Sequence, residues 1–154
     1  MKLVLLPSGE AGPALGQGTW RMGEDLAIRR EEIETLRLGL DLGASLIDTA
    51  EMYGEGSAEQ LVGKAMEGRR DAVFLVDKVL PQNAPRRGML QAYDGSLLRL
   101  GKDRIDLYLL HWRGNIPLHE TLEAFTTLQR DGKILAGRRN HLRFPSSTPY
   151  PWRQ

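Results

Sequence analysis

The sequence lacks cysteine, long apolar runs and any imbalance of charge. Without cysteine, disulfides, thiol catalysis and thiolate metal sites are excluded. The 21 basic and 20 acidic side chains give a formal net charge of +1, which favours neither nucleic acid nor membrane as a partner. No run approaches the ~20 apolar residues of a membrane span, and only four apolar residues separate Lys2 from Pro7, too few for a signal peptide. We therefore expect a soluble, cytoplasmic protein.

Strand-like and helix-like segments alternate along most of the chain, which at 154 residues and 41% hydrophobic content is long enough for one domain with a core. Strands are expected at 3–6, 45–48, 72–78 and 105–110, and 7–18 has the glycine and proline content of a loop. Helices are expected over about 30–42, from Ser57 (with Gln60 as a capping box), between Pro85 and Gly101, and between Pro117 and Gly132. This alternation predicts an α/β fold with a parallel sheet and helices packed outside it.

Three ionisable residues, Asp48, Lys78 and His111, stand where three of these apolar runs end. Consecutive members are about one βα repeat apart, since a strand and its crossover helix take roughly 30 residues. We therefore expect all three at the same end of adjacent strands, where α/β barrels build active sites. A charge at the end of a buried strand costs free energy unless it is paired or used. The pattern thus indicates a functional site.

Tyr53 follows Asp48 in a loop expected at the same end of the sheet. Phenols are weak acids, with a pKa of about 10 in model peptides. A lysine ammonium stabilises the phenolate, and a carboxylate keeps that lysine charged and oriented. A histidine across the pocket can hydrogen-bond a substrate oxygen. The set suits proton donation to a carbonyl that is being reduced, and the hydride must then come from a cofactor.

Several motifs in one order resemble the aldo-keto reductase superfamily over about 15–136. They are Leu15-Gly16-Gln17-Gly18-Thr19-Trp20, Asp48-Thr49-Ala50-Glu51-Met52-Tyr53-Gly54 followed by Ser57-Ala58-Glu59, Lys78-Val79, and Leu109-Leu110-His111-Trp112. The resemblance implies an NADPH-dependent oxidoreductase that reduces aldehydes or ketones to alcohols. It implies Tyr53 as the general acid, Lys78 and Asp48 as its tuning pair, and His111 as the residue that orients the carbonyl. Gly18, Thr19, Trp20 and Asp48 would lie near the nicotinamide end of NADPH.

Two residues depart from the pattern that this resemblance implies. Asp77 precedes the lysine where the family more often has a small residue, and Arg113 follows His111-Trp112 where proline is common. Because strand side chains alternate between faces, Asp77 should point away from the pocket of Lys78, and we expect its effect to be minor. His119 and His141 have no partner pattern, and we expect no metal site.

The resemblance also implies a TIM-type (β/α)8 barrel, which typically takes ~250 residues. Residues 1–136 would supply only its first half, four to five βα units. Residues 137–154 contain four arginines, three prolines and no acidic residue, and show neither helical nor strand periodicity. We expect them to form a disordered tail outside the family pattern, of the kind that a shifted reading frame or an early stop produces. A basic tail that binds an acidic partner is the alternative.

Three functions remain open from the sequence. The first is the carbonyl reductase described above. The second is an inactive half barrel, which could self-associate through its open sheet edges. The third is a non-catalytic interaction protein that kept the start of the barrel, although such a protein would have no physical need for Asp48, Tyr53, Lys78 and His111 together. The loops that clamp the phosphates of NADPH cannot be assigned in this chain, so we expect this cofactor to bind weakly or not at all.

Overall fold

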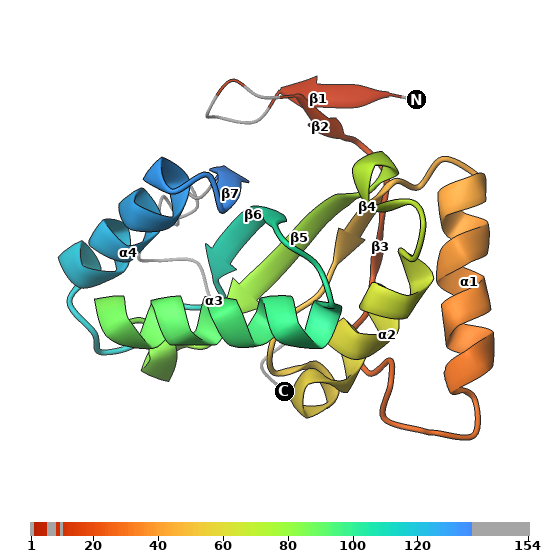
Figure 1. Ribbon diagram of the computed structural model, residues 1–154, viewed down its shortest axis with the longest axis horizontal. Helices are drawn as coiled ribbons and strands as arrows, with labels where there is room; N and C mark the ends of the chain where they lie inside the picture. Colours follow the sequence, from red (N-terminus) through yellow and green to blue (C-terminus); the bar gives the residue numbers. More distant parts are fainter. Residues whose placement is uncertain (1, 6–8, 10, 137–154) are drawn as a thin grey trace, which may run out of the picture.

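Five parallel strands form the central sheet of the computed structural model, which describes residues 2–5, 9 and 11–136. The strands are β3 (Gly16–Gly18), β4 (Leu46–Asp48), β5 (Phe74–Val79), β6 (Ile105–Leu110) and β7 (Ile134–Ala136), and they lie in the sheet in their sequence order. The helices α1 (Arg29–Asp41), α2 (Ser57–Ala65), α3 (Arg86–Leu100) and α4 (Leu118–Arg130) connect successive strands. Figure 1 shows these helices along one side of the curved sheet. The arrangement is an incomplete TIM-type barrel, which confirms the fold prediction.

The two faces of the sheet have different neighbours because successive side chains of a strand point in opposite directions. Ile47, Leu75, Val79 and Tyr108 belong to the large core between the sheet and the helices. The inner face carries a smaller cluster that consists of Val76 and Leu107 with the partly buried Leu46, Phe74 and Leu109. Asp48 and Lys78 follow the inner alternation, and Asp77 follows the outer one.

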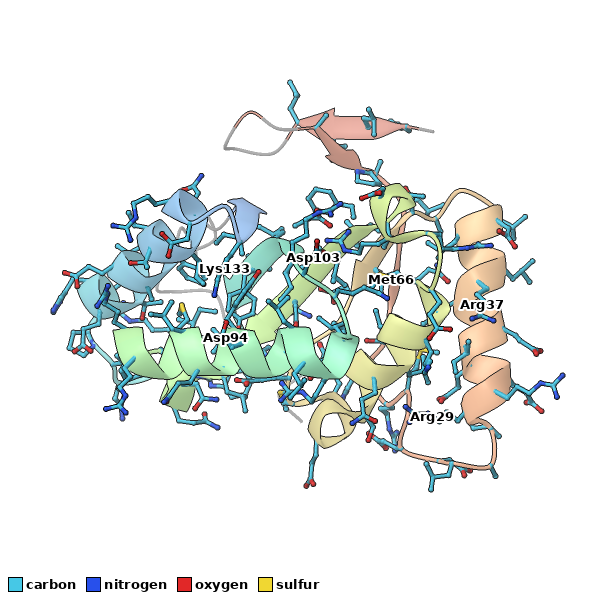
Figure 2. The ribbon with its side chains drawn as sticks, viewed as in Figure 1. Arg29, Arg37, Met66, Asp94, Asp103 and Lys133 are labelled. Carbon is cyan, nitrogen blue, oxygen red and sulfur yellow. The ribbon has the colours of Figure 1, made fainter. Side chains whose placement is uncertain are left out.

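The helices approach each other closely outside the sheet. Gly63 of α2 lies against the end of α3, where a side chain at this position would overlap the carbonyl group of Leu100. Lys133, just before β7, donates a hydrogen bond from Nζ to Asp94 of α3 (3.0 Å), and Figure 2 labels both residues. The Tyr93 hydroxyl donates to the carbonyl oxygen of Lys133. These contacts fix α3 relative to the last described strand.

The N-terminal region contains more strand than the sequence predicts. The expected strand at the start of the chain is β1 (Leu3–Leu5), which pairs with β2 (Ala11–Pro13) in an antiparallel hairpin. Both β2 and β3 fall within 7–18, so the loop expected there is wrong for these residues. Neither strand shows an apolar alternation, since β2 reads Ala-Gly-Pro and β3 reads Gly-Gln-Gly. Pairing with β4 defines β3, in which Gly18 lies opposite Asp48.

The capping box predicted at Ser57 is also wrong. A short turn, η1 (Tyr53–Gly56), precedes α2, and Gly54, Glu55 and Gly56 in this turn have positive φ angles. Ser57 already has helical dihedral angles (φ −64°, ψ −34°). Gly56 takes the N-cap position, and no side chain caps the helix there. The short helices η2 (Arg70–Ala72) and η3 (Pro81–Asn83) flank β5, so this strand covers 74–79 instead of 72–78.

Candidate active site

The ionisable residues that the sequence singles out lie at the carboxyl ends of neighbouring strands. Asp48 is the last residue of β4, and Lys78 is the penultimate residue of β5. His111 directly follows β6, and its backbone N–H donates to the carbonyl of Val79 (2.9 Å). Tyr53 begins η1 in the loop after β4. The strand register therefore brings Asp48, Lys78 and His111 to the same end of the sheet, as expected, and the loop after β4 places Tyr53 there too.

Lys78 lies at the centre of this group. Its Nζ donates to the Asp48 carboxylate (2.8 Å), to the carbonyl oxygen of Thr49 (2.9 Å) and to the Tyr53 hydroxyl (3.3 Å). A lysine ammonium has three N–H donors, so each of them has an acceptor. The Lys78 side chain is 14% exposed and the Asp48 side chain 36% exposed, so the pair is only partly shielded from water. The arrangement holds a cation against the phenol oxygen of Tyr53.

His111 closes the group from the side of β6. Its ring lies edge-on to the Tyr53 ring, with 5.6 Å between ring centroids, and contacts Trp112 on its other side. Burial lowers the pKa of His111 below its usual value, and the Lys78 charge acts in the same direction against a smaller opposite effect of Asp48. The imidazole is therefore neutral near pH 7. Its buried Nδ1 atom has no hydrogen-bond partner among the described residues.

The residues expected near a nicotinamide ring occupy the end of β3 and the residues after it. The Thr19 side chain is buried, and both its N–H and its hydroxyl donate to the carbonyl oxygen of Asp48 (3.0 and 3.1 Å). Thr19 therefore fastens the chain after β3 to β4. Trp20, in contrast, is 72% exposed. Beside Gly18 there is open space, since a side chain there would meet no atom within 4 Å.

The loop residue Glu51 also supports the group, although its role is not predicted from the sequence. The backbone N–H of Glu51 donates to the carbonyl of Lys78 (3.2 Å). Its carboxylate accepts hydrogen bonds from the Leu80 N–H (2.6 Å) and from the Asn83 side chain (2.9 Å). These bonds tie the Asp48–Tyr53 loop to the chain that leaves β5. A single carboxylate in a loop gives no sequence signal for this role.

Asp77 has a larger part than the sequence analysis gave it. It lies on the outer face, as predicted, but it is fully buried, and its Oδ1 accepts the backbone N–H of Lys78 (2.7 Å). The predicted direction of the Asp77 side chain, away from the pocket, is therefore confirmed, and its bond to the Lys78 backbone adds a contact that the prediction did not include. The signal that could have revealed this role is an acidic residue at a helix-facing position between the apolar Leu75 and Val79.

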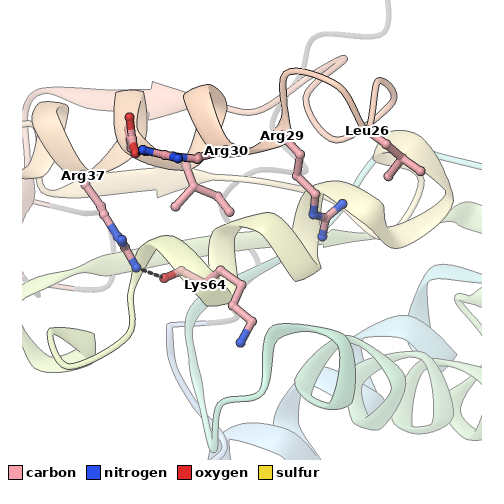
Figure 3. Close-up of a pocket in the computed structure, with 7 residues that line it drawn as sticks. Leu26, Arg29, Arg30, Arg37 and Lys64 are labelled. Carbon is pink, nitrogen blue, oxygen red and sulfur yellow. Dashed lines mark hydrogen bonds and ion pairs between the residues drawn. The ribbon is translucent and has the colours of Figure 1, made fainter.

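A surface depression between α1 and α2 is separate from this group (Figure 3). It is lined by Leu26, Arg29, Arg30, Ile33, Glu34, Arg37 and Lys64. Two of its cations have carboxylate partners, because Arg30 pairs with Glu34 and Lys64 pairs with Glu67. Within the described ranges, no three potential metal-binding side chains gather, and no helix there is long and apolar enough to cross a membrane.

Comparison with known proteins defines the class to which this fold and site belong. The model of the aldo/keto reductase family matches residues 14–137. The chain therefore belongs to this family. Methylglyoxal reductase YeaE of Escherichia coli (strain K12) is 49% identical over 133 residues, which are 86% of this chain and 47% of that protein. Aldo-keto reductase YhdN of Bacillus subtilis (strain 168) is 38% identical over 143 residues, with coverage of 84% and 43%.

Solved structures give the same result. An aldo/keto reductase from Klebsiella pneumoniae, crystallised in complex with NADP and acetate, is 52% identical and superposes with a TM-score of 0.82. The match covers 86% of this chain and 47% of that one. The thermostable aldo-keto reductase Tm1743, in complex with the inhibitor epalrestat, is 42% identical with a TM-score of 0.82 and coverage of 87% and 52%. The chain thus spans about half the length of the relatives it matches.

Proposed function

We propose that this chain carries the proton-donating centre of an NADPH-dependent reductase of small aldehydes or ketones, with Tyr53 as the general acid. The observation that carries the proposal is the position of Lys78, whose ammonium group contacts both the Asp48 carboxylate and the Tyr53 hydroxyl. Two relatives support the same chemistry, since one is a methylglyoxal reductase and the other is an aldo/keto reductase crystallised with NADP.

In this mechanism Tyr53 transfers its phenolic proton to the carbonyl oxygen of the substrate. The Lys78 ammonium, 3.3 Å from the phenol oxygen, stabilises the phenolate that the transfer leaves. Asp48 in turn holds that ammonium in place by its ion pair. Because Lys78 is largely shielded from water, these charges interact more strongly than exposed ones would.

His111 orients the carbonyl in this proposal. The neutral imidazole stands edge-on to Tyr53, so an oxygen placed between the two rings can contact the phenol and the imidazole together. A neutral imidazole is also uncharged beside Lys78, which avoids repulsion between two cations. The lowered pKa of His111 is consistent with this role, since it keeps the ring neutral over the pH range in which most enzymes operate.

The described residues fit the nicotinamide end of NADPH. This cofactor supplies the hydride when it is bound. The open space beside Gly18, in register with Asp48, leaves room for a planar ring next to the proposed acid. The exposed Trp20 lies two residues further along the chain and could line the same space. Thr19 would act only through the position of Asp48, because its own polar groups are already bonded.

The test is consumption of NADPH by the purified chain with methylglyoxal, propanal and a simple ketone as separate substrates. Formation of the alcohol should accompany NADPH oxidation and should depend on both the chain and the carbonyl compound. A Lys78→Met variant should lose this activity, whereas Lys64→Met, which removes an exposed lysine, should keep it. Equal rates for the two variants would contradict the proposal.

The second candidate function is a half barrel that keeps these four side chains without turnover. The open sheet favours it, because β3 and β7 each have a strand partner on one side only among the described residues. A folded chain that neither quenches NADPH fluorescence nor consumes NADPH would support this candidate. Self-association that completes the wall around the site would instead appear as activity that rises more steeply than the protein concentration.

A further inference from the structure

A buried cluster of charged groups lies behind Lys78, on the helix side of the sheet. Asp77 of β5 and Glu59 of α2 are both fully buried. The Glu59 carboxylate accepts two hydrogen bonds from the Arg99 guanidinium of α3, one of them at 3.2 Å. Arg99 also bonds the Ser96 hydroxyl (3.2 Å). The carbonyl-reducing centre on the other face of the sheet does not use these residues.

The charges of the cluster balance only if one carboxyl group holds a proton. Two ionised carboxylates and one guanidinium would leave a net negative charge in the core, which is costly. Oδ2 of Asp77 is buried and accepts no hydrogen bond from the described residues. Burial and the neighbouring Glu59 raise the pKa of Asp77 well above its usual value, against the opposing effect of the Lys78 backbone N–H. A proton on Oδ2 would account for both observations, since it would neutralise this buried carboxyl group beside the charge of Glu59.

The other ionisable groups that face the cluster do not replace this proton. Tyr108 of β6 lies close, and burial together with Asp77 raises its pKa well above the usual value, so it stays a neutral phenol. The negative charge of Glu51, in the loop after β4, also raises the pKa of Tyr108. Lys78 acts on Asp77 from the opposite face, where its ammonium is already paired with Asp48. Arg99 is the cation of the cluster, and its guanidinium bonds the Glu59 carboxylate.

The cluster touches both segments that carry the proposed catalytic pair. Asp77 accepts the backbone N–H of Lys78 (2.7 Å), which fixes the strand just where the lysine leaves it. Gly56 ends the turn that begins with Tyr53, and any side chain at Gly56 would overlap the Arg99 side chain. Gly56 also has a positive φ of 91°, which favours glycine. Arg99 thus packs directly against the turn of Tyr53 while it bonds Glu59.

We propose that Glu59, Asp77 and Arg99 position Lys78 and Tyr53 from behind the sheet, with one proton shared between the two carboxyl groups so that Asp77 anchors the Lys78 backbone as a neutral acid. A neutral Asp77 gives a hydrogen bond without placing a second anion beside Lys78. A second anion near Lys78 would offset the positive charge of its ammonium group. The ammonium would then stabilise the Tyr53 phenolate less. The positioning role depends on the proposed function, but the shared proton does not.

Stability measurements against pH test the shared proton without any activity. Because the folded chain keeps the Asp77 proton to higher pH than the unfolded chain, the contribution of Asp77 to stability should fall as pH rises above about 4. The unfolding equilibrium constant should increase up to tenfold per pH unit from this group, or ~1.4 kcal/mol. Asp77→Asn, which mimics the neutral acid, should remove that increase. An unchanged pH profile in this variant would overturn the shared proton.

Asp106→Asn is the matched control. Asp106 is also a buried strand aspartate that accepts a backbone N–H at 2.7 Å, from Leu75, but it pairs with the Arg70 guanidinium at 2.8 Å instead of facing a carboxyl group. Its replacement should destabilise the chain at neutral pH, because Arg70 loses its anion. Asp77→Asn should not. The proposal is wrong if the two variants are equally destabilised at pH 7.

Nuclear magnetic resonance separates the positioning role from simple stability. In the unmodified chain the ¹³Cγ signal of Asp77 and the amide signal of Lys78 should titrate together, well above the usual range of an aspartate. Nuclear Overhauser contacts between Lys78 and the Tyr53 ring should persist in Asp77→Asn and weaken in Asp77→Leu, which has no acceptor. Should Asp77→Leu not fold, the joint titration still decides. A carboxylate signal for Asp77 throughout pH 5–7, or unchanged contacts in a folded Asp77→Leu, would overturn the proposal.

Turnover distinguishes failure of this proposal from failure of the proposed function. If the chain reduces methylglyoxal, kcat should fall in Asp77→Leu and stay near its original value in Asp77→Asn, with little change in KM. If the chain does not turn over, the titration and the contacts of Lys78 still test the cluster. Loss of kcat in both variants together would contradict the neutral anchor.

Discussion

Replacement of Lys78 by methionine and of Asp48 by asparagine, singly and together, measures how strongly the two side chains interact in the folded chain. Lys78 Nζ and Asp48 Oδ1 lie 2.8 Å apart, and the side chains of Lys78 and Asp48 are 14% and 36% exposed. Exposed ion pairs contribute ~0.2–1 kcal/mol, whereas hydrogen bonds to charged groups in shielded positions contribute about 1.5–3 kcal/mol. The Lys78–Asp48 pair is only partly exposed, and Lys78 is the more buried partner. We therefore expect a coupling energy toward the upper range, about 2 kcal/mol.

The surface of α2 offers a control pair with the same chemistry. Lys64 and Glu67 also lie 2.8 Å apart, but their side chains are 63% and 53% exposed. A parallel cycle with Lys64→Met and Glu67→Gln should give about 0.3–0.5 kcal/mol. Urea unfolding at pH 7, followed by tryptophan fluorescence, gives the free energy of unfolding for each variant. Equal coupling energies in the two cycles would refute the reasoning that burial strengthens the pair at the candidate site.

Three further predictions concern other parts of the chain. The pKa of the His111 ring, followed in an NMR pH series, should lie below the usual histidine value. Because protonation of this ring then opposes folding, its contribution to stability should fall as pH falls through that region, and His111→Gln should remove this contribution. Gly63→Ala should destabilise the chain because a side chain there overlaps Leu100, whereas Gly95→Ala, which meets only the end of the Arg99 side chain, should stabilise it by about 0.5–1 kcal/mol. Leu75→Ala should cost about 2–5 kcal/mol, and Leu98→Ala, which is 82% exposed, should change urea stability little.

The helices and the buried strands follow directly from the sequence because their apolar periodicity is strong. The predicted helix over about 30–42 is α1 at 29–41, and the strand at 105–110 is β6 with the same bounds. The weaker predictions failed where tertiary contacts decide the local structure. The Gly-Gln-Gly segment of β3 has no apolar side chain, and only pairing with β4 makes it a strand. Ser57 is the first residue of α2 because the left-handed Gly56 takes the N-cap position, which a local capping pattern does not reveal. Residues 137–154, where the tail is expected, lie outside the described residues.

The candidate site was predictable to the extent that it depends on strand spacing. Asp48, Lys78 and His111 meet because each follows a strand of one parallel sheet, and Tyr53 comes with the loop after β4. The contacts of Thr19 and Glu51 were not predictable, since they depend on which way single loop residues turn. The buried cluster behind Lys78 brings together residues of two helices and one strand, and one sequence contains no signal of such distant partners.

The most direct test of the central claim compares the chain with its Tyr53→Phe variant for both NADPH binding and methylglyoxal reduction. The substitution removes only the hydroxyl group that lies 3.3 Å from the Lys78 ammonium. We expect the two proteins to bind NADPH with the same affinity, and we expect the variant to lose at least about 100-fold in kcat because it lacks the general acid. Turnover by Tyr53→Phe at the rate of the unmodified chain would contradict the account.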